Sequence, residues 1–496
     1  MYITEHWQDY QTAIRNNSRP YDKIEGTVTF ASKPSLAITT AIMPTNSITI
    51  SKQCIDGDEL MFGGVFASTL KMSLMIPKDR QSGITAISRY DFFNAIIDLT
   101  YYIQIGTQNN LPVYEEVPLG IFKVADADRP HDTVNLTAYD NMTMLDIDIG
   151  SNIIGGTVWQ VFQRIHTDIG IDLAFTETDL QNFPNFEYPI ECAKDKGINT
   201  YRDIVKVLCQ LLGCFAYADR TGKLALKAFS STSDLTLGIG DWYSMIPADY
   251  KTHYVGLSVT GLAGTYSATS SDPSEVGSIM LIEDAPAWDL GTQASLQERT
   301  SEFFTYLHTL EYTPSEIEMP SDPTFDCGDM LALIPRNGDP NDPTTWIYTI
   351  ITSMEWKFHN GMSITSEGIN PYLSQEAIID PDSQRILSQA VAKSKLQFIH
   401  FTNPENVSVA DTKSKKIAEV EFTPTGDTEG LFFATILINA TVADITKTTP
   451  ATVHVPITVK DAQGQPAVIT DLQGNPLTVT GSATNTYTYK RDGKCD

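Results

Sequence analysis

The stretch from residue 113 to residue 145 constrains the fold most, because it predicts a long antiparallel hairpin. Its first arm contains an apolar run, and its second arm alternates apolar with polar side chains. The run is Leu119, Ile121, Phe122 and Val124; the alternation sets Val134, Leu136 and Ala138 on one face and Asn135, Thr137 and Tyr139 on the other. The polar segment DADRPHD joins the arms, and Pro130 within it lacks the N–H that a strand interior needs. A half-buried hairpin of this kind favours a β-rich body.

Length and composition extend this expectation to the whole chain. At roughly 150 residues per domain, 496 residues predict about three domains. A hydrophobic content of 42% with 19% charged residues is typical of folded protein. Short alternating runs among the Gly and Pro residues favour a mainly β fold with a small α+β domain. We expect two β-barrels and a C-terminal β-sandwich-like domain.

The charge balance argues against nucleic-acid binding. The formal net charge is −27, from 61 acidic and 34 basic residues, and no cluster of Lys and Arg is present to release counterions from DNA. An acidic wall can nevertheless surround DNA, because it repels phosphate. Any channel formed by this protein is therefore expected to be acidic, although the same charge on an outer surface would simply keep the protein soluble.

The cysteines and the N-terminus indicate an intracellular product. Six cysteines stand far apart, at 54, 192, 209, 214, 327 and 495, and a chain this long can bury a core without disulfides. Cys209 and Cys214 are the one close pair, and the His partners of a zinc site are missing. The N-terminus has no secretory signal pattern. No run of about 18 apolar residues predicts a membrane span.

The first barrel is predicted within residues 1–145. Thr4 is expected to cap a helix that ends at Ile14. Strands are expected at 27–30, 36–42, 47–51, 66–76 and 96–105, followed by the 113–145 hairpin. These strands suffice for one closed barrel over about 21–145.

A small α+β domain is predicted for residues 146–235. The pairs Thr157–Gln160 and Thr200–Asp203 have capping-box spacing, and Gly213 is expected to end the second helix. The hairpin that follows is predicted to turn through a four-residue loop, 219–222. This register would place Tyr217 opposite Leu224 and Phe215 opposite Leu226.

A second barrel is predicted for residues 240–372, with a helical insertion near 292–312. Ser295 is expected to cap that helix, and Phe303, Leu307 and Leu310 to line its buried face. The last hairpin contains Asn360-Gly361, which could form a two-residue turn pairing Phe358 with Ser363. We instead predict a three-residue loop, 359–361, which pairs Phe358 with Met362 and Trp356 with Ile364.

The C-terminal quarter is predicted to be a linker and a separate domain. Residues 373–399 include a helix over about 383–397, which is either a spacer, the favoured reading, or a trimer seam. Residues 400–496 alternate as strands, with a ten-residue repeat (DAQGQPAVIT, DLQGNPLTVT) that is typical of a meander. After Tyr487 and Tyr489 a turn signal lacks its return strand, so we expect a longer natural chain whose later part contacts the host.

Motifs that carry chemistry are absent from the sequence. Gly222-Lys223 lacks the rest of a phosphate loop, and neither HExxH nor GxSxG occurs. The acidic groups Asp126, Asp128 and Asp132, and Asp339 and Asp342, lack the Ca²⁺-loop pattern. We therefore predict no catalytic, cofactor-binding or metal-binding residues, no cofactor, and a protein that is not an enzyme.

Two stretches resemble a known family. The strings PLGIFKV…R…VNLTAYDNM…LD, from Pro118, and YRDIVKVLCQLLGCFAYADRTGKLAL, from Tyr201, resemble bacteriophage tail hub, or tail-associated baseplate hub, proteins. The resemblance covers about residues 1–372. It implies a homotrimer at the virion tail tip that closes the tail tube, with DNA passing through on ejection. It also implies assembly in the bacterial cytoplasm, with a distal tail or tail tube protein and a tape measure protein as partners.

Two alternatives remain open at this point. Some members of the resembled family carry wall-degrading domains after the hub, so a tail-associated cell-wall hydrolase is the second hypothesis. The third is an adhesin that binds a host-surface polysaccharide or receptor through residues 400–496.

Overall fold

The computed structural model describes most of the first three quarters of the chain and four short strands after it. The described residues are 1–15, 22–44, 46–57, 59–76, 87–150, 153–192, 197–261, 264–272, 275–283, 285–371, 451–456, 469–470, 476–477 and 482–487. Two compact units are distinguished, Met1–Ala392 and Lys393–Asp496.

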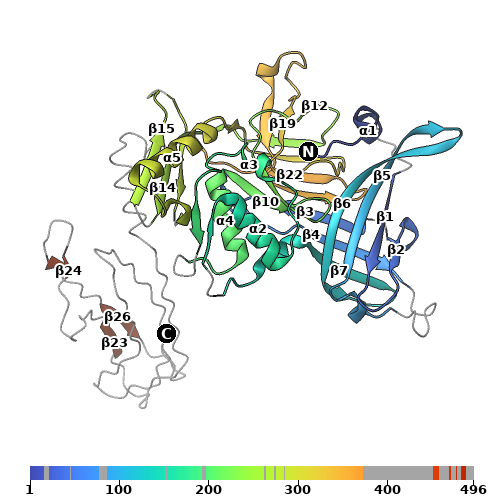
Figure 1. The fold of residues 1–496 in the computed structure, drawn as a ribbon, viewed down its shortest axis with the longest axis horizontal. Coiled ribbons are helices and arrows are strands. Elements are labelled where there is room, and N and C mark those ends of the chain that lie inside the picture. Colours follow the sequence, from blue (N-terminus) through green and yellow to red (C-terminus); the bar gives the residue numbers. More distant parts are fainter. Residues whose placement is uncertain are drawn as a thin grey trace. The chain divides into compact units, whose positions relative to one another are not determined.

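One 11-stranded sheet runs through the first unit, in the order β13-β18-β22-β21-β3-β4-β7-β6-β5-β1-β2 (Figure 1). Its early strands are β1 (Asp22–Thr29), β2 (Leu36–Ile38), β3 (Ile48–Gln53), β4 (Thr69–Met75), β5 (Ile96–Gln108), β6 (Leu111–Asp128) and β7 (Thr133–Asp140). Its late strands are β13 (Ser244–Pro247), β18 (Ser315–Met319), β21 (Ser353–Lys357) and β22 (Met362–Ser366). Because β21 pairs with β3, strands from both predicted barrel regions share this sheet. The boundaries of the predicted domains stay predictions.

The sheet curls strongly. Tyr101 on β5 and Trp356 on β21 are separated by five strand steps in the pairing order, which would be about 24 Å in a flat sheet. Their ring centroids lie 6.3 Å apart, and His359 Nε2 lies 2.6 Å from Asp22 Oδ1 between the same two parts of the sheet. The early strands and β21 therefore wrap around a common interior. Among the described residues, the two end strands of the sheet, β13 and β2, are not paired with each other.

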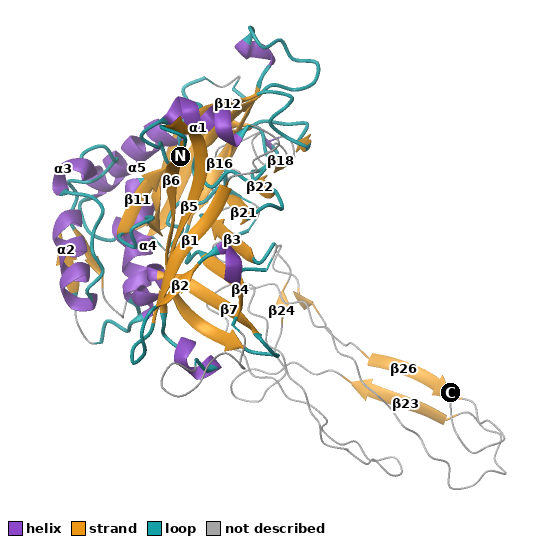
Figure 2. Cartoon of the chain, turned by 90° about the vertical axis from the view of Figure 1, so that its right-hand side faces the viewer, coloured by secondary structure: helices purple, strands orange, loops and turns teal. Residues whose placement is uncertain are grey.

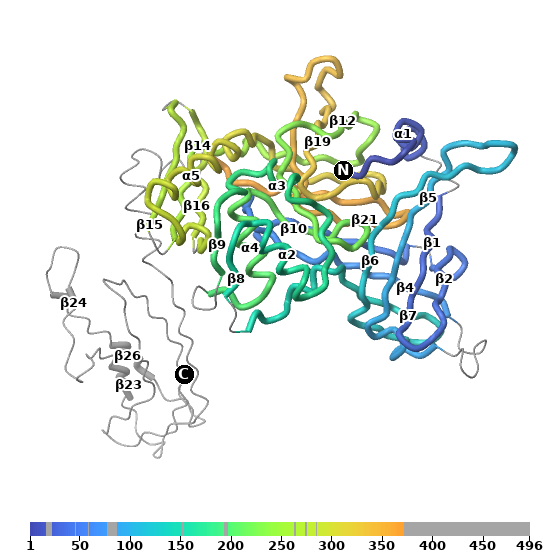
Figure 3. The backbone as a smooth tube through the Cα atoms, in the orientation of Figure 1, coloured from blue at the N-terminus to red at the C-terminus, as the bar shows by residue number. Residues whose placement is uncertain are grey.

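The hairpin predicted at residues 113–145 is confirmed as β6 and β7, which pair antiparallel. Val134, Leu136 and Ala138 are buried in the core as expected. β6 also pairs with the long β5. The tip of this second hairpin, residues 106–112, is exposed and extends beyond the neighbouring strands (Figure 3).

In its described residues, the predicted α+β segment contains three helices and two small sheets. Its elements are β8 (Ile154–Gly156), α2 (Val158–Ile169), α3 (Glu177–Leu180), β9 (Ile190–Cys192), α4 (Tyr201–Leu212), β10 (Cys214–Ala218) and β11 (Leu224–Ala228). Both predicted capping boxes are confirmed, at Thr157 and Thr200, and Gly213 ends α4 with a left-handed φ of 64°. Together with α5 (Gln293–Leu307), these helices lie along one side of the strands (Figure 2).

The rest of the first unit consists of smaller sheets and short helices. One sheet holds β12 (Leu235–Leu237), β19 (Met330–Leu333) and β20 (Ile347–Ile350); another holds β14 (Thr252–Gly261), β15 (Gly264–Thr269), β16 (Ser278–Ile282) and β17 (Glu311–Tyr312). The 3₁₀ turns are η1 (Thr40–Ile42), η3 (Arg89–Phe92), η4 (Asn141–Asp146), η6 (Pro286–Trp288) and η7 (Pro343–Thr345).

Two predicted helix starts are wrong. α1 spans Trp7–Ile14 and begins after His6, not Thr4, because the His6 backbone N–H bonds to the Glu115 carboxylate instead. α5 spans Gln293–Leu307 and is capped by Thr292, whose hydroxyl accepts from the backbone N–H of Ser295. Ser295 is therefore the third residue of that helix. Phe303 and Leu307 are buried as predicted, and Leu310 is buried beyond the helix end.

The predicted register of the β10–β11 hairpin is wrong by one residue. Tyr217 lies opposite Ala225 and Phe215 opposite Lys227, because the loop has five residues. Asp219 holds this loop through its carboxylate, which accepts from the Thr221 and Lys223 N–H groups. Both faces of the hairpin are largely buried, so alternation could not select the register.

The predicted register of the β21–β22 hairpin is wrong by two residues. Trp356 lies opposite Met362 and Met354 opposite Ile364. The Lys357 N–H donates to the Gly361 carbonyl, so the loop is 358–360. Phe358 leaves the ladder to pack near Tyr101, with ring centroids 6.3 Å apart. A slip of two keeps the same side chains inward.

The second unit is described at four strands. β23 (Ala451–Pro456), which contains the predicted strand residues Val453 and Val455, pairs with β26 (Ser482–Tyr487). β24 (Ile469–Thr470) pairs with β25 (Pro476–Leu477), so each repeat copy supplies one strand to the pair. The predicted linker helix at 383–397, the strands before residue 451 and the chain end after Tyr487 lie outside the described residues.

The structure also describes the state of the cysteines and the character of the helices. Cys54, Cys192, Cys209, Cys214 and Cys327 are free thiols and all are buried; Cys495 lies outside the described residues. Within the described ranges, no helix has the length and apolar character needed to cross a membrane.

Candidate functional site

The two segments that resemble tail hub proteins, which begin at Pro118 and at Tyr201, contact each other. We call this contact the docking contact. Arg220, in the β10–β11 loop, donates through Nη1 to the Pro118 carbonyl of β6 at 2.8 Å. Asn141, at the start of η4, donates through Nδ2 to the Gly222 carbonyl at 2.7 Å. Gly222 has a φ of +81°, and a Cβ there would lie 2.7 Å from Asn141 Nδ2. The glycine is therefore needed for both its conformation and its close approach.

Arg202 extends the docking contact to helix α4. Its Nε lies 2.5 Å from Asp146 Oδ1, Nη2 donates to the Met142 carbonyl at 2.8 Å, and Nη1 donates to the Val65 carbonyl. Arg202 and Asp146 border an open recess of about 360 Å³. The recess is lined by Val65, Phe66, Ala67, Tyr139, Thr143, Asp146 and Arg202. Because these bonds occupy its guanidinium, Arg202 holds α4 against η4.

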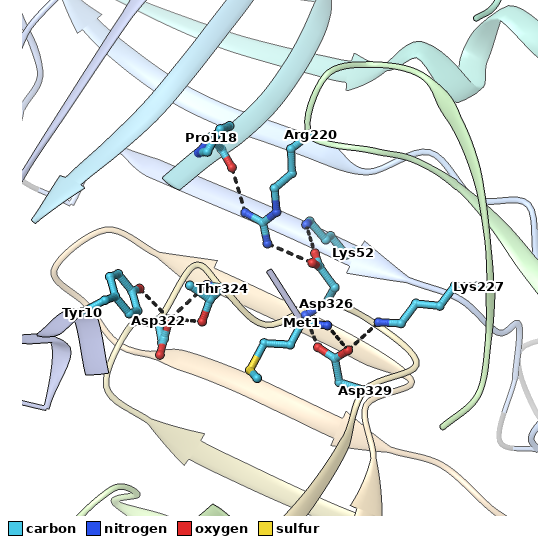
Figure 4. A network of polar contacts seen from close by, with 10 residues as sticks. All are labelled: Met1, Tyr10, Lys52, Pro118, Arg220, Lys227, Asp322, Thr324, Asp326 and Asp329. Atoms are coloured by element: carbon cyan, nitrogen blue, oxygen red, sulfur yellow. Dashed lines mark hydrogen bonds and ion pairs between the residues drawn. The ribbon is translucent and has the colours of Figure 1, made fainter. Parts of the chain in front are cut away.

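An acidic loop at residues 322–329 joins further parts of the chain (Figure 4). Asp326 accepts from Lys52 Nζ of β3 at 2.6 Å and from Arg220 Nη2 at 2.9 Å. Burial raises the pKa of Asp326, but the charges of Arg220 and Lys52 more than offset it, so the pKa lies well below its ordinary value. Asp326 is therefore a carboxylate held between two cations.

Asp329 fastens the N-terminus to the same loop. It accepts from Lys227 Nζ of β11 at 2.5 Å and pairs with the Met1 ammonium group. Burial lowers the pKa of Lys227, but the neighbouring Asp329 and Asp326 raise it above its ordinary value overall. At the loop's start, Asp322 accepts from the Tyr10 hydroxyl at 2.8 Å. The loop thus binds α1, β3, β11 and the docking contact together.

The acidic loop is a structural joint. Its two central carboxylates are each paired with two cationic groups, so neither is placed to exchange a proton with a substrate. No local sequence pattern predicts this joint, because the partners of Asp326 and Asp329 lie more than 100 residues away along the chain. Of the acidic groups noted in the sequence, Asp339 and Asp342 hold the β19–β20 loop by accepting from Asn341 N and Thr344 N.

Both ends of the large sheet display exposed apolar side chains. Beside β13 these are Ile239, Tyr243 and Ile246, and Tyr243 and Ile246 are 66% and 62% exposed. At the other end, Tyr90 within η3 and Phe93 directly after it are 74% and 65% exposed. η3 lies near the β1–β2 turn, because the Phe30 and Phe92 rings are 5.2 Å apart. We call these two sets the β13 patch and the η3 patch.

Comparisons with known proteins give a likeness in fold. No protein-family model and no curated protein matches the chain. The 43 kDa tail protein of prophage MuSo2 from Shewanella oneidensis is 12% identical, with a TM-score of 0.41 over 71% of this chain and 98% of its own. The prophage tail protein gp18 from Listeria monocytogenes EGD-e is 10% identical, with a TM-score of 0.44 over 74% and 99%. A Francisella PdpA-VgrG complex is 10% identical, with a TM-score of 0.41 over 71% and 53%.

Phage tail proteins are also the class that the sequence resembles. With every TM-score below 0.5, none of these structures assigns a role to a residue of this chain.

Proposed function

We propose that this chain is a structural hub of a phage tail tip. It closes the distal end of the tail tube, links the tube to host-contacting parts and lets DNA pass on ejection. The docking contact carries this proposal. The residues that resemble tail hub proteins are the ones that hold the β6–β7 hairpin, η4 and the β10–β11 loop together in this chain.

A rigid body suits this role. The shared sheet connects early and late strands, and the acidic loop ties the N-terminus to the same body. Ion pairs with little solvent exposure resist separation more than exposed pairs do, because breaking one leaves an unpaired charge. A subunit that must keep a tube sealed and then transmit force benefits from such joints.

The β13 and η3 patches support a homotrimer. They lie at opposite ends of the sheet order, so joining one patch to the other in a neighbouring copy gives a head-to-tail contact. Such a contact closes into a three-membered ring when the rotation between copies is a third of a turn. Three copies with two strand regions each would present six similar units to a hexameric tail tube. A distal tail or tail tube protein and a tape measure protein are the proposed partners.

The net charge of −27 suits a conduit for DNA. If acidic side chains line the channel of the ring, they repel phosphate and keep DNA from adhering. A channel lined mainly by Lys and Arg would contradict this part of the proposal.

Light scattering on the purified chain tests the assembly. The proposal expects a mass of about three times the 54.8 kDa of one chain at high protein concentration. A mass near 54.8 kDa throughout a concentration series would contradict a trimer that forms without partners. Incubation with purified cell wall is the companion assay, and hydrolysis abolished by one Asp or Glu substitution would favour the hydrolase hypothesis instead.

A further inference from the structure

Three side chains from separate elements converge beside α5. His253 lies on β14, Glu275 precedes β16, and His308 follows the last residue of α5. Their potential ligand atoms all lie within 4.8 Å of one another, and no second group of this kind is found among the described residues. His253 Nε2 is 2.8 Å, and His308 Nε2 is 3.6 Å, from Glu275 Oε1.

Both imidazoles are oriented by backbone carbonyls. His308 Nδ1 lies 2.9 Å from the Tyr254 carbonyl and His253 Nδ1 lies 3.3 Å from the Leu310 carbonyl. Because a carbonyl only accepts, each Nδ1 must carry the hydrogen, which leaves Nε2 of a neutral ring with a free lone pair. In most metal-binding histidines, a hydrogen bond from the ring nitrogen that does not hold the metal fixes the tautomer in this way.

The carboxylate is oriented in the same way. The Ser270 hydroxyl donates to Glu275 Oε2, while Oε1 faces the two Nε2 atoms. A glutamate side chain is ordinarily ionised at neutral pH, so Oε1 offers a negatively charged ligand atom. Two lone pairs and one negative oxygen thus point at a common centre.

The structure assigns a divalent transition-metal site to His253, Glu275 and His308, with Zn²⁺ as its simplest occupant. Two imidazole nitrogens and one carboxylate oxygen suit Zn²⁺ better than Ca²⁺ or Mg²⁺, which prefer oxygen ligands. Tetrahedral ligands about 2.0–2.1 Å from zinc lie about 3.4 Å apart. The 3.6 Å separation fits this value, and the 2.8 Å separation opens by about 0.6 Å on binding.

The site would link the end of α5 to β14 and β16, which already pair in parallel within one sheet. β14, the segment before β16 and the end of α5 would share one ion, and the fourth coordination position stays open, since the three side chains are 16–36% exposed. Sequence reasoning missed the site because His253 and His308 are 55 residues apart (308 − 253) and no local motif links them. This inference does not depend on the proposed hub function.

Metal binding to the untagged full-length chain tests the assignment. After removal of metals with a chelator, Zn²⁺ is titrated in competition with a chromophoric chelator. We expect one equivalent to bind, and Glu275→Gln and His308→Ala to weaken the affinity by more than about 100-fold. Zn²⁺ should raise the Tm of the wild type but not of these two variants. His131→Ala, at an exposed histidine in the β6–β7 loop, is the control that retains binding.

Two results would overturn the assignment. Absence of a one-equivalent site in the wild type would mean that the cluster is an imidazolium–carboxylate ion pair. Unchanged Zn²⁺ affinity in both variants would place the bound metal elsewhere. Circular dichroism establishes that each variant is folded, and Glu275→Gln keeps the shape of the side chain if His308→Ala does not fold.

Discussion

Asp326 connects parts of the chain that are distant in sequence. Lys52 of β3 and Arg220 of the β10–β11 loop both pair with it, and their side chains are 20% and 9% exposed. At this exposure each charge depends on its partner, because water replaces the lost interaction poorly. Loss of the Asp326 charge should therefore weaken the fold.

Asp326→Asn should lower the free energy of unfolding by about 3 kcal/mol, because it leaves Lys52 and Arg220 without their common partner. Urea unfolding followed by tryptophan fluorescence measures this loss. Glu25→Gln is the control, because Glu25 pairs with Lys23 at 2.7 Å but is 46% exposed, and its loss should stay within about 0.5 kcal/mol. Equal effects of the two substitutions would show that the acidic loop is not a joint.

The depressed pKa of Asp326 also predicts a pH dependence. A carboxyl whose pKa is lower in the folded state stabilises the fold above its unfolded pKa, about 3.9, and loses that contribution as pH falls toward the folded value. The difference in unfolding free energy between wild type and Asp326→Asn should therefore be smaller at pH 3 than at pH 7. A difference that does not change with pH would contradict the charged pairing.

At the scale of elements, two helices end in the same way with different surroundings. Gly170 ends α2 with φ +76°, and Gly213 ends α4 with φ +64°. A Cβ on Gly170 would meet nothing within 4 Å, whereas one on Gly213 would lie 2.5 Å from Phe303 Cε2. The pair separates the cost of backbone strain from the cost of packing.

Gly170→Ala should cost about 1 kcal/mol of unfolding free energy, the strain of a left-handed alanine. Gly213→Ala should cost at least about 1 kcal/mol more, since it also displaces the Phe303 ring from the core. Thermal or urea unfolding of both variants gives the comparison. Identical losses would mean that α4 and α5 do not pack together as described.

These elements also show what the sequence can predict. α2 and α4 were predictable because capping boxes and the helical period are local signals. The registers of two hairpins could not be predicted. In the β10–β11 hairpin, both faces are largely buried, so the side chain of Phe215 does not favour one register. In the β21–β22 hairpin, Phe358 does not pair with β22 and instead packs near Tyr101, which is distant in sequence. The contacts of the acidic loop, and the convergence of His253, Glu275 and His308, join residues that are far apart in the sequence. No local sequence pattern predicts them.

At the scale of the molecule, the two ends of the sheet decide how copies assemble. Among the described strands, β13 pairs with β18 alone, and Ile246 stands exposed upon it. A charge placed there should block strand pairing and apolar contact without disturbing the subunit.

Ile246→Lys should therefore reduce the mass measured by light scattering to about 54.8 kDa while changing the unfolding free energy by no more than about 0.5 kcal/mol. Ile153→Lys is the matched control, because Ile153 is 69% exposed beside β8, away from the sheet ends, and it should leave the oligomer intact. A trimer that survives Ile246→Lys would exclude the β13 patch from the interface.

The role of the chain as a tail-tip hub is tested most directly by electron cryomicroscopy of the tail that contains it. The proposal predicts three copies around the tail axis at the distal end of the tube, with the β13 patch of each copy against the η3 patch of the next. A single copy at the tip, or copies absent from the tail altogether, would contradict it.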